Sequence, residues 1–119
     1  MRVLLVRHNE APKIVNIPHT LSEMQRLVGG DIEIAEPFDD DVVLVCGENG
    51  RNDGMPLNCI INSNLDIFGN FFLCECRETE LEDLPEEKIF RYASMFRLPR
   101  NRNISAAEEA KRPLHQILS

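Results

Sequence analysis

The residue pair most suggestive of a reaction is Arg7-His8, which follows a short apolar run. An imidazole at the end of a buried strand can attack phosphorus while a neighbouring guanidinium holds the phosphate oxygens. That chemistry needs a small residue after the histidine and a second histidine as a further phosphate contact. Here Asn9 follows instead, and His19 and His115 lie in no partner motif. Phosphate handling by Arg7 and His8 is therefore kept as an alternative, and we assign no catalytic residue.

The cysteines form the second candidate set. Cys74 and Cys76 share one face of an expected strand, and Cys46 can lie nearby on a neighbouring strand, an arrangement that can hold zinc. Structural zinc sites, however, use close ligand pairs on turns, and the chain contains no C-x-x-C pair. We therefore predict that these three thiols and Cys59 are reduced and pack as small apolar side chains, with no disulfide, metal or other cofactor.

A polar loop is the third candidate. The segment Gly47–Gly54 contains the turn dipeptides Asn49-Gly50 and Asp53-Gly54, which predict a surface loop. It has neither the ligand order of a calcium loop nor the lysine of a phosphate-binding loop. Loops on rigid scaffolds are common binding surfaces, so we interpret this loop as a recognition surface. The candidate residues for binding a ligand or partner are Glu48, Asn49, Arg51, Asn52, Asp53 and Asn58.

Charge is unevenly distributed. The whole chain carries a net charge of −7, although residues 88–112 hold seven basic side chains against two acidic ones. The remaining body is therefore strongly acidic, so it repels phosphate backbones and attracts basic surfaces. We do not expect direct nucleic-acid binding, since the consecutive Phe71 and Phe72 also point to opposite faces of a strand. The residues predicted to face a basic protein partner are Asp31, Glu33, Glu36, Asp39, Asp40 and Asp41.

Most of the elements that position these candidate residues are predicted to be strands. Residues 3–6, which lie between Arg2 and Arg7, and residues 42–46 are uninterrupted apolar runs, typical of strands covered on both faces. Residues 13–17 are expected to pair with the first run. Residues 31–36 alternate polar and apolar residues, which predicts a partner for the second run with an acidic outer face. Residues 66–76 predict a further strand or a bent hairpin, and Gly69 within them suggests a bulge.

Two helices are expected to pack on these strands. Thr20–Glu23 matches a capping box and predicts a helix start, and Gly29-Gly30 predicts its end. A second helix is predicted to begin with Asp83 as its capping residue and to end before Pro99. The positions expected to face the core are Leu21, Met24, Leu27 and Val28 in the first helix and Ile89, Phe90, Ala93 and Phe96 in the second.

This order predicts an α+β fold, a mixed and mainly antiparallel β-sheet with two packed helices and a short C-terminal helix. Residues 1–98 are expected to form a single domain, and residues 99–119 a basic, polar linker with the short helix that starts near Ser105. The apolar residues of that helix are candidates for pairing with a second subunit, so a homodimer is one possible state; they are Leu114, Ile117 and Leu118.

Size and composition agree with one globular domain. The chain has 119 residues, of which 43% are hydrophobic and 28% charged. The longest apolar runs are far shorter than the ~20 residues needed to cross a bilayer. The first residues also lack the apolar region of a signal peptide. We therefore expect a cytoplasmic protein without membrane contact.

The segment from Thr20 to Asn58 resembles a family of domains of unknown function in small proteins of bacteriophages, plasmids and other mobile elements. The likeness lies in the Leu27-Val28-Gly29-Gly30 helix end, the Ile32-Glu33 strand and the Glu48-Asn49-Gly50 turn, and it extends over about residues 1 to 98. The resemblance implies a fold and a genetic context, without an activity to transfer.

Three functions follow as hypotheses. The first is a non-enzymatic binding or regulatory protein that recognises a host or phage protein through its acidic and loop surfaces, for example as a DNA mimic or an inhibitor of a defence system. The second is a sponge for a small, nucleotide-like polar ligand, bound by the loop. The third is the phosphate-handling enzyme that would use Arg7 and His8.

Overall fold

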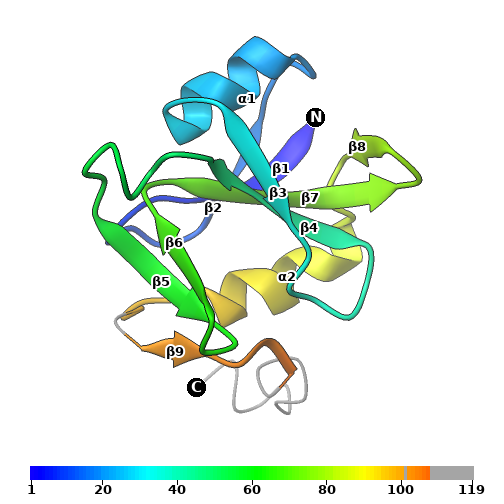
Figure 1. Cartoon of the computed structure of the whole chain (residues 1–119). Coiled ribbons are helices and arrows are strands. Elements are labelled where there is room, and N and C mark those ends of the chain that lie inside the picture. The colour runs from blue at the N-terminus through cyan, green and yellow to red at the C-terminus, as the bar shows by residue number, and fades with distance from the viewer. Residues whose placement is uncertain (101, 108–119) are drawn as a thin grey trace.

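The two apolar runs become interior strands of a six-stranded sheet, as a computed structural model that describes residues 1–100 and 102–107 shows (Figure 1). They are β1 (Arg2–Val6) and β4 (Val42–Gly47), and β7 (Phe71–Arg77) lies between them, antiparallel to both. Val42 to Cys46 are all buried, because apolar layers cover both faces of the sheet.

The strands divide between two sheets instead of forming one. The larger sheet has the order β2-β1-β7-β4-β3, with β8 paired to β7, and all of its pairs are antiparallel. The smaller sheet has the order β6-β5-β9, in which β5 and β9 run parallel. The predicted α+β class with mainly antiparallel pairing is confirmed. The remaining strands are β2 (Lys13–Asn16), β3 (Ile32–Ala35), β5 (Leu57–Ile61), β6 (Leu65–Phe68), β8 (Glu80–Glu82) and β9 (Asn103–Ile104).

Gly69 directs the chain from one sheet to the other. Residues 66–76 form neither a single strand nor a bent hairpin, so that prediction is wrong. Strand β6 ends at Phe68, and Gly69, at a φ of 79°, turns the chain into β7 of the larger sheet. Glycine adopts this left-handed conformation without a steric penalty. The register irregularity lies elsewhere, between Leu57 and Cys59 of β5.

Helix α1 (Leu21–Val28) begins as predicted, since the Thr20 hydroxyl accepts a hydrogen bond from the Glu23 backbone N–H. It ends at Gly29, which has a φ of 83°. The second contact of a capping box, from the Glu23 side chain back to the Thr20 backbone N–H, is replaced, because the Glu23 carboxylate pairs with Arg26. Leu21, the first residue of the helix, is 56% exposed, so the buried stripe starts one turn later than predicted.

Helix α2 (Glu86–Met95) starts after Pro85 without a side-chain cap. The predicted capping residue Asp83 instead accepts a hydrogen bond from the Arg2 backbone N–H at 2.8 Å and fixes the start of β1. Phe90, expected in the core, is 43% exposed. Tyr92 is buried in its place, because its hydroxyl group finds a polar partner inside the protein.

The larger sheet has an apolar core on each face. One core lies under α1, and the other is enclosed by α2 and the smaller sheet. Ile104 and Ala106 belong to the second core and Arg100 is buried, so these three residues of the segment after Leu98 pack against the body. The predicted C-terminal helix lies largely outside the described residues, as do Leu114, Ile117 and Leu118.

The described residues include two helices, and neither combines the length and the apolar character that a membrane crossing requires. All four cysteines are free thiols, and three of them, Cys46, Cys59 and Cys74, are buried.

Candidate functional site

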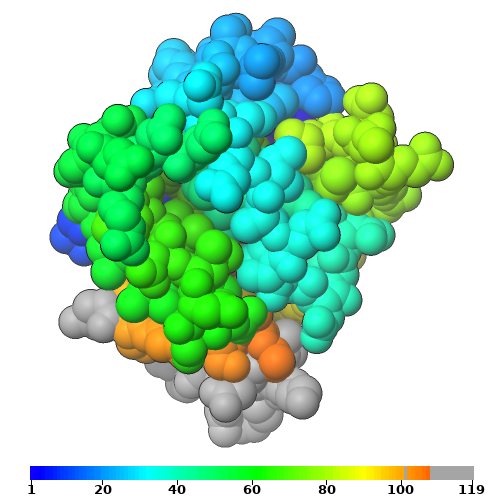
Figure 2. All heavy atoms as spheres, viewed as in Figure 1, coloured from blue at the N-terminus to red at the C-terminus, as the bar shows by residue number. Residues whose placement is uncertain are grey.

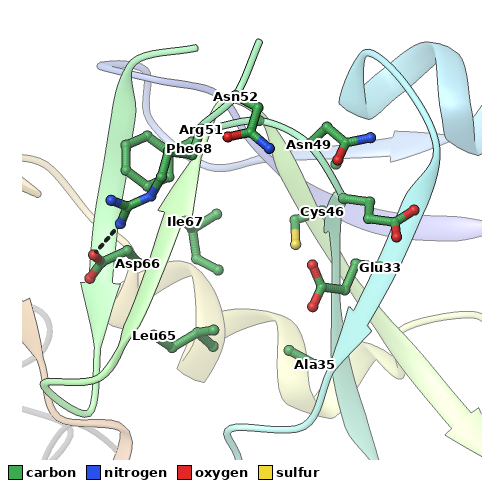
Figure 3. A pocket seen from close by; sticks show the side chains of 13 residues that line it. Glu33, Ala35, Cys46, Asn49, Arg51, Asn52, Leu65, Asp66, Ile67 and Phe68 are labelled. Atoms are coloured by element: carbon green, nitrogen blue, oxygen red, sulfur yellow. Dashed lines mark hydrogen bonds and ion pairs between the residues drawn. The ribbon is translucent and has the colours of Figure 1, made fainter. Parts of the chain in front are cut away.

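A cleft of about 300 Å³ lies between the β3 edge of the larger sheet and the smaller sheet (Figure 3). Strand β3 and the end of β4 form one wall, β6 forms the other, and the loop over residues 48–52 closes one end. The side chains at the bottom are mainly apolar: Ala35, Cys46, Leu65, Ile67 and Phe68. The exposed rim is polar, with Glu33, Glu48, Asn49, Arg51, Asn52 and Asp66.

Backbone hydrogen bonds hold the loop in place. The Glu48 N–H donates to the Asp31 carbonyl at 2.7 Å, which joins the loop to the start of β3. Inside the loop, the Asp53 N–H donates to the Asn49 carbonyl at 2.8 Å. Gly50 lets the loop rest on β6, because a Cβ atom there would lie only 2.8 Å from the Phe68 carbonyl oxygen. The loop is therefore held against β3 and β6 and forms a wall of the cleft.

The basic side chain on the rim is already neutralised. Arg51 forms an ion pair with Asp66, with 3.0 Å between Nη2 and Oδ2. Its guanidinium also stacks on the Phe68 ring, 4.7 Å from the ring centroid. Arg51 therefore contributes shape and hydrogen-bond donors to the rim, and little net positive charge.

Glu33 and Glu48 give the cleft its net charge. Neither carboxylate has an ion pair within residues 1–100 and 102–107. The buried Cys46 thiol faces the cleft beside Glu33 (Figure 3). Burial, and to a smaller extent the negative charge of Glu33, raises the pKa of Cys46 to about 11. The thiol therefore stays protonated and uncharged near neutral pH. Because Glu33 and Glu48 leave the cleft with a negative charge, the site is suited to binding a cation.

Most of the predicted loop residues meet at this cleft. Glu48, Asn49, Arg51 and Asn52 line it, whereas Asp53 is exposed on the loop and does not.

Asn58 does not line this cleft and makes internal contacts instead. It is 6% exposed, and its amide nitrogen donates to the carbonyls of Val6 and Gly69 at 3.1 and 2.9 Å. The irregularity in β5 turns this side chain inward, where it joins β1 to the turn between the two sheets.

The predicted acidic surface is divided by the fold. Glu33 reaches the cleft, and four of the others are exposed: Asp31, Glu36, Asp39 and Asp41. Asp40 is an internal partner instead. It accepts hydrogen bonds of 2.9 Å from the Tyr92 hydroxyl and from the Val42 N–H, and it forms an ion pair with Arg91 at 3.3 Å. Its carboxylate therefore holds α2 against the sheet.

Sequence reasoning missed the residues of β6. Asp66 and Phe68 line the cleft because β5 and β6 form a hairpin whose second strand lies against the loop. The turn-forming residues Asn62 to Asn64 between two apolar segments were the available signal for that hairpin. The pairing of Arg51 with Asp66 had no local signal.

The histidines lie in different places. His8 lines a shallow depression with Arg26 and Met55, whereas His19 lines another depression with Met1. His115 falls outside the described residues. The Arg7 guanidinium lies 4.0 Å from Glu10.

Among the residues that the structure describes, no three His, Cys, Asp or Glu side chains are grouped so as to hold a metal ion.

The fold and the site define an α+β protein with an acidic cleft between two sheets. Its chain belongs to the DUF3846 family, a domain of unknown function, whose family model matches residues 1–97. All residues that line the cleft lie within this matched range. No curated protein and no solved structure matches the chain.

Proposed function

We propose that this protein is a non-enzymatic binding module whose cleft recognises a basic segment of a protein partner. One observation carries the proposal. Glu33 and Glu48 face the same cleft without a cation beside them in the described part of the chain, while Asp66 neutralises Arg51. A lysine or arginine side chain supplies the missing positive charge.

The shape of the cleft supports the same class of ligand. Lysine and arginine combine an apolar stem with a charged head. The mainly apolar bottom, with Cys46 and Ile67, suits the stem, and the polar rim suits the head. Exposed acidic residues in the segment that follows β3, including Glu36 and Asp39, would attract a basic partner from a distance.

A nucleotide-like ligand is less well supported, because the unpaired carboxylates of Glu33 and Glu48 repel phosphate. A small amine ligand would use the same contacts as a lysine side chain, so it is the alternative that the experiment below separates from a peptide. If the chain comes from a mobile element, as its resemblance implies, a host or phage protein with a basic surface is the expected partner.

The test uses a labelled peptide of alternating lysine and valine, a matched glutamate–valine peptide, and free lysine amide as the small amine. Fluorescence anisotropy, with lysine amide as competitor, compares the wild type with the double variant Glu33→Gln/Glu48→Gln. The control is Glu78→Gln/Glu80→Gln, which changes the net charge equally at the β7–β8 turn, on the opposite side of the view in Figure 2 from the loop.

We expect the lysine–valine peptide to bind the wild type, with an affinity about tenfold lower in the cleft variant and nearly unchanged in the control, since each rim carboxylate contributes roughly 0.5 to 1 kcal/mol. Equal weakening by both variants would show nonspecific charge attraction and contradict the proposal. Binding of lysine amide as tight as that of the peptide would favour the small-ligand alternative.

A further inference from the structure

Strand β3 forms one edge of the larger sheet. It pairs with β4 on one side, and no strand among residues 1–100 and 102–107 pairs with its other side. The strand borders the cleft, because Glu33 and Ala35 line it (Figure 3). An unpaired strand edge presents backbone N–H and C=O groups that can accept another strand.

The register shows which backbone groups are free. The Glu48 N–H donates to the Asp31 carbonyl, so these two residues are a hydrogen-bonded pair of the antiparallel ladder. Because such pairs alternate along a ladder, the backbone groups of Glu33 and Ala35 also face β4. Those of Ile34, between them, point outward from the sheet.

The side chains of β3 alternate between two faces. Glu33 and Ala35 lie on the cleft face, whereas Ile32 and Ile34 lie on the face covered by α1. Ile32 is partly buried against that core, but Ile34 is 46% exposed. A free strand edge with an exposed β-branched side chain on one face and a carboxylate on the other is suited to a strand of alternating apolar and basic residues.

We infer that the partner segment binds as an additional β-strand along β3, with its basic side chains entering the cleft and its apolar side chains covering Ile34. The inference rests on the proposed function and specifies its geometry. Backbone hydrogen bonds to the Ile34 N–H and C=O supply part of the affinity, and the alternating side chains supply the selectivity.

A second copy of the chain is a poor occupant of this edge. Pairing β3 with another β3 would place the acidic Glu33 and Glu36 of both copies along one shared strand pair. Like charges on facing strands are destabilising. A basic strand relieves that repulsion, so the charge pattern selects a partner of opposite charge over self-association.

The chain offers a matched control edge. Strand β2 is the opposite edge of the larger sheet, and its Ile14 is 50% exposed. The Ile17 N–H donates to the Met1 carbonyl, so by the same alternation the backbone groups of Ile14 also point outward. That edge carries the basic Lys13 and lies apart from the cleft, so a basic strand is not expected to pair there.

Amide hydrogen exchange of the full-length protein, followed by NMR, tests the geometry with the lysine–valine peptide. We expect exchange of the Ile34 amide to slow at least about tenfold on saturation, while the Ile14 amide stays unchanged. Two peptides with alternate amides methylated provide a second readout. Only one edge of an added strand faces β3, so methylation of either the lysine or the valine amides abolishes binding, and methylation of the other set does not.

Equal affinities of the two methylated peptides, or peptide binding without protection of Ile34, would overturn strand addition. If such binding still depended on Glu33 and Glu48, the proposed function would stand and only its geometry would fall. Failure of the unmodified peptide to bind the wild type would overturn both.

Discussion

Asn58 and Arg100 lie 42 residues apart in the sequence and meet in the interior, where Arg100 Nε donates to Asn58 Oδ1 at 3.2 Å. The same guanidinium donates to the carbonyls of Phe96 and Arg7 at 2.6 and 2.5 Å. Arg100 is 5% exposed, and burial lowers its pKa. This pair therefore joins the segment after α2 to the smaller sheet and to the end of β1.

Replacing Asn58 is expected to affect stability and not binding. Asn58→Ala leaves two buried carbonyls and one guanidinium N–H without their partner, at a cost of about 2 to 4 kcal/mol. Urea unfolding measures this loss, and peptide anisotropy measures binding under folded conditions. A variant with unchanged stability but weaker peptide binding would return Asn58 to the recognition surface.

A buried ion pair is expected to be sensitive to the loss of one partner. Glu75 is 2% exposed, and Lys88 Nζ lies 3.2 Å from its carboxylate. Among residues 1–100 and 102–107, the ion pair that Lys88→Met leaves to this carboxylate is a longer one, 3.7 Å, to Arg77, so we expect about 3 kcal/mol lower stability. The double variant Lys88→Met/Glu75→Leu should regain most of the loss in urea unfolding. A Lys88→Met protein as stable as the wild type would contradict this account.

The buried thiols predict a loss of stability at alkaline pH. Burial raises the pKa values of Cys46, Cys59 and Cys74 to about 11, 12 and 12. Unfolding restores ordinary values of about 8.5. Below that pH both states keep the protons. Above it the unfolded state releases them first, so stability falls by up to about 1.4 kcal/mol per pH unit and per thiol.

Urea unfolding between about pH 8 and pH 10.5 measures that slope. Cys74→Ala removes one of the three thiols and should flatten the slope by about a third, whatever its effect on stability at neutral pH. An identical slope in this variant would show that other groups titrate there.

Gly50 should be needed for the cleft. A Cβ at this position meets the Phe68 carbonyl at 2.8 Å, so Gly50→Ala pushes the loop away from β6 and costs about 1 to 3 kcal/mol. We expect it to weaken peptide binding as well. The control is Gly54→Ala, which has open space around the added atom and a strained φ of 74°. Peptide affinity should fall for Gly50→Ala alone; equal affinities in the two variants would separate the loop from binding.

Peptide affinity should fall as salt rises. Glu33 and Glu48 are exposed on the rim, and exposed charges are screened within roughly 8 Å at physiological ionic strength. The dependence on salt should be shallower for Glu33→Gln/Glu48→Gln than for the wild type. A salt-independent affinity would mean that apolar contacts at Ile34 dominate.

Local signals predicted the elements better than their assembly. Some features depend only on neighbours in sequence and could be predicted before the fold was known. They are the Thr20 cap, the Gly29 end of α1 and the apolar runs of β1 and β4. The division into two sheets depends on the turn at Gly69. A single glycine within an apolar segment is equally compatible with a bulge in one strand and with a turn between two strands, so the sequence could not distinguish them.

The site was predicted in part for the same reason. Loop composition pointed to Glu48, Asn49, Arg51 and Asn52, and all four line the cleft. Polarity alone could not separate exposed from internal roles. Asp40 and Asn58 are both polar residues next to turns, but long-range contacts pair Asp40 with Tyr92 of α2 and bury Asn58 beside Arg100.

The parallel pair of β5 with β9 has a practical consequence for fragment boundaries. The family match ends at residue 97, yet Arg100 and Ile104 complete the interior beyond it. A fragment that ends at residue 97 would expose the edge of β5 that pairs with β9, and it would remove the Arg100 guanidinium that donates to Asn58. Recombinant versions should therefore extend past Ala106 if they are to behave as one cooperative folding unit.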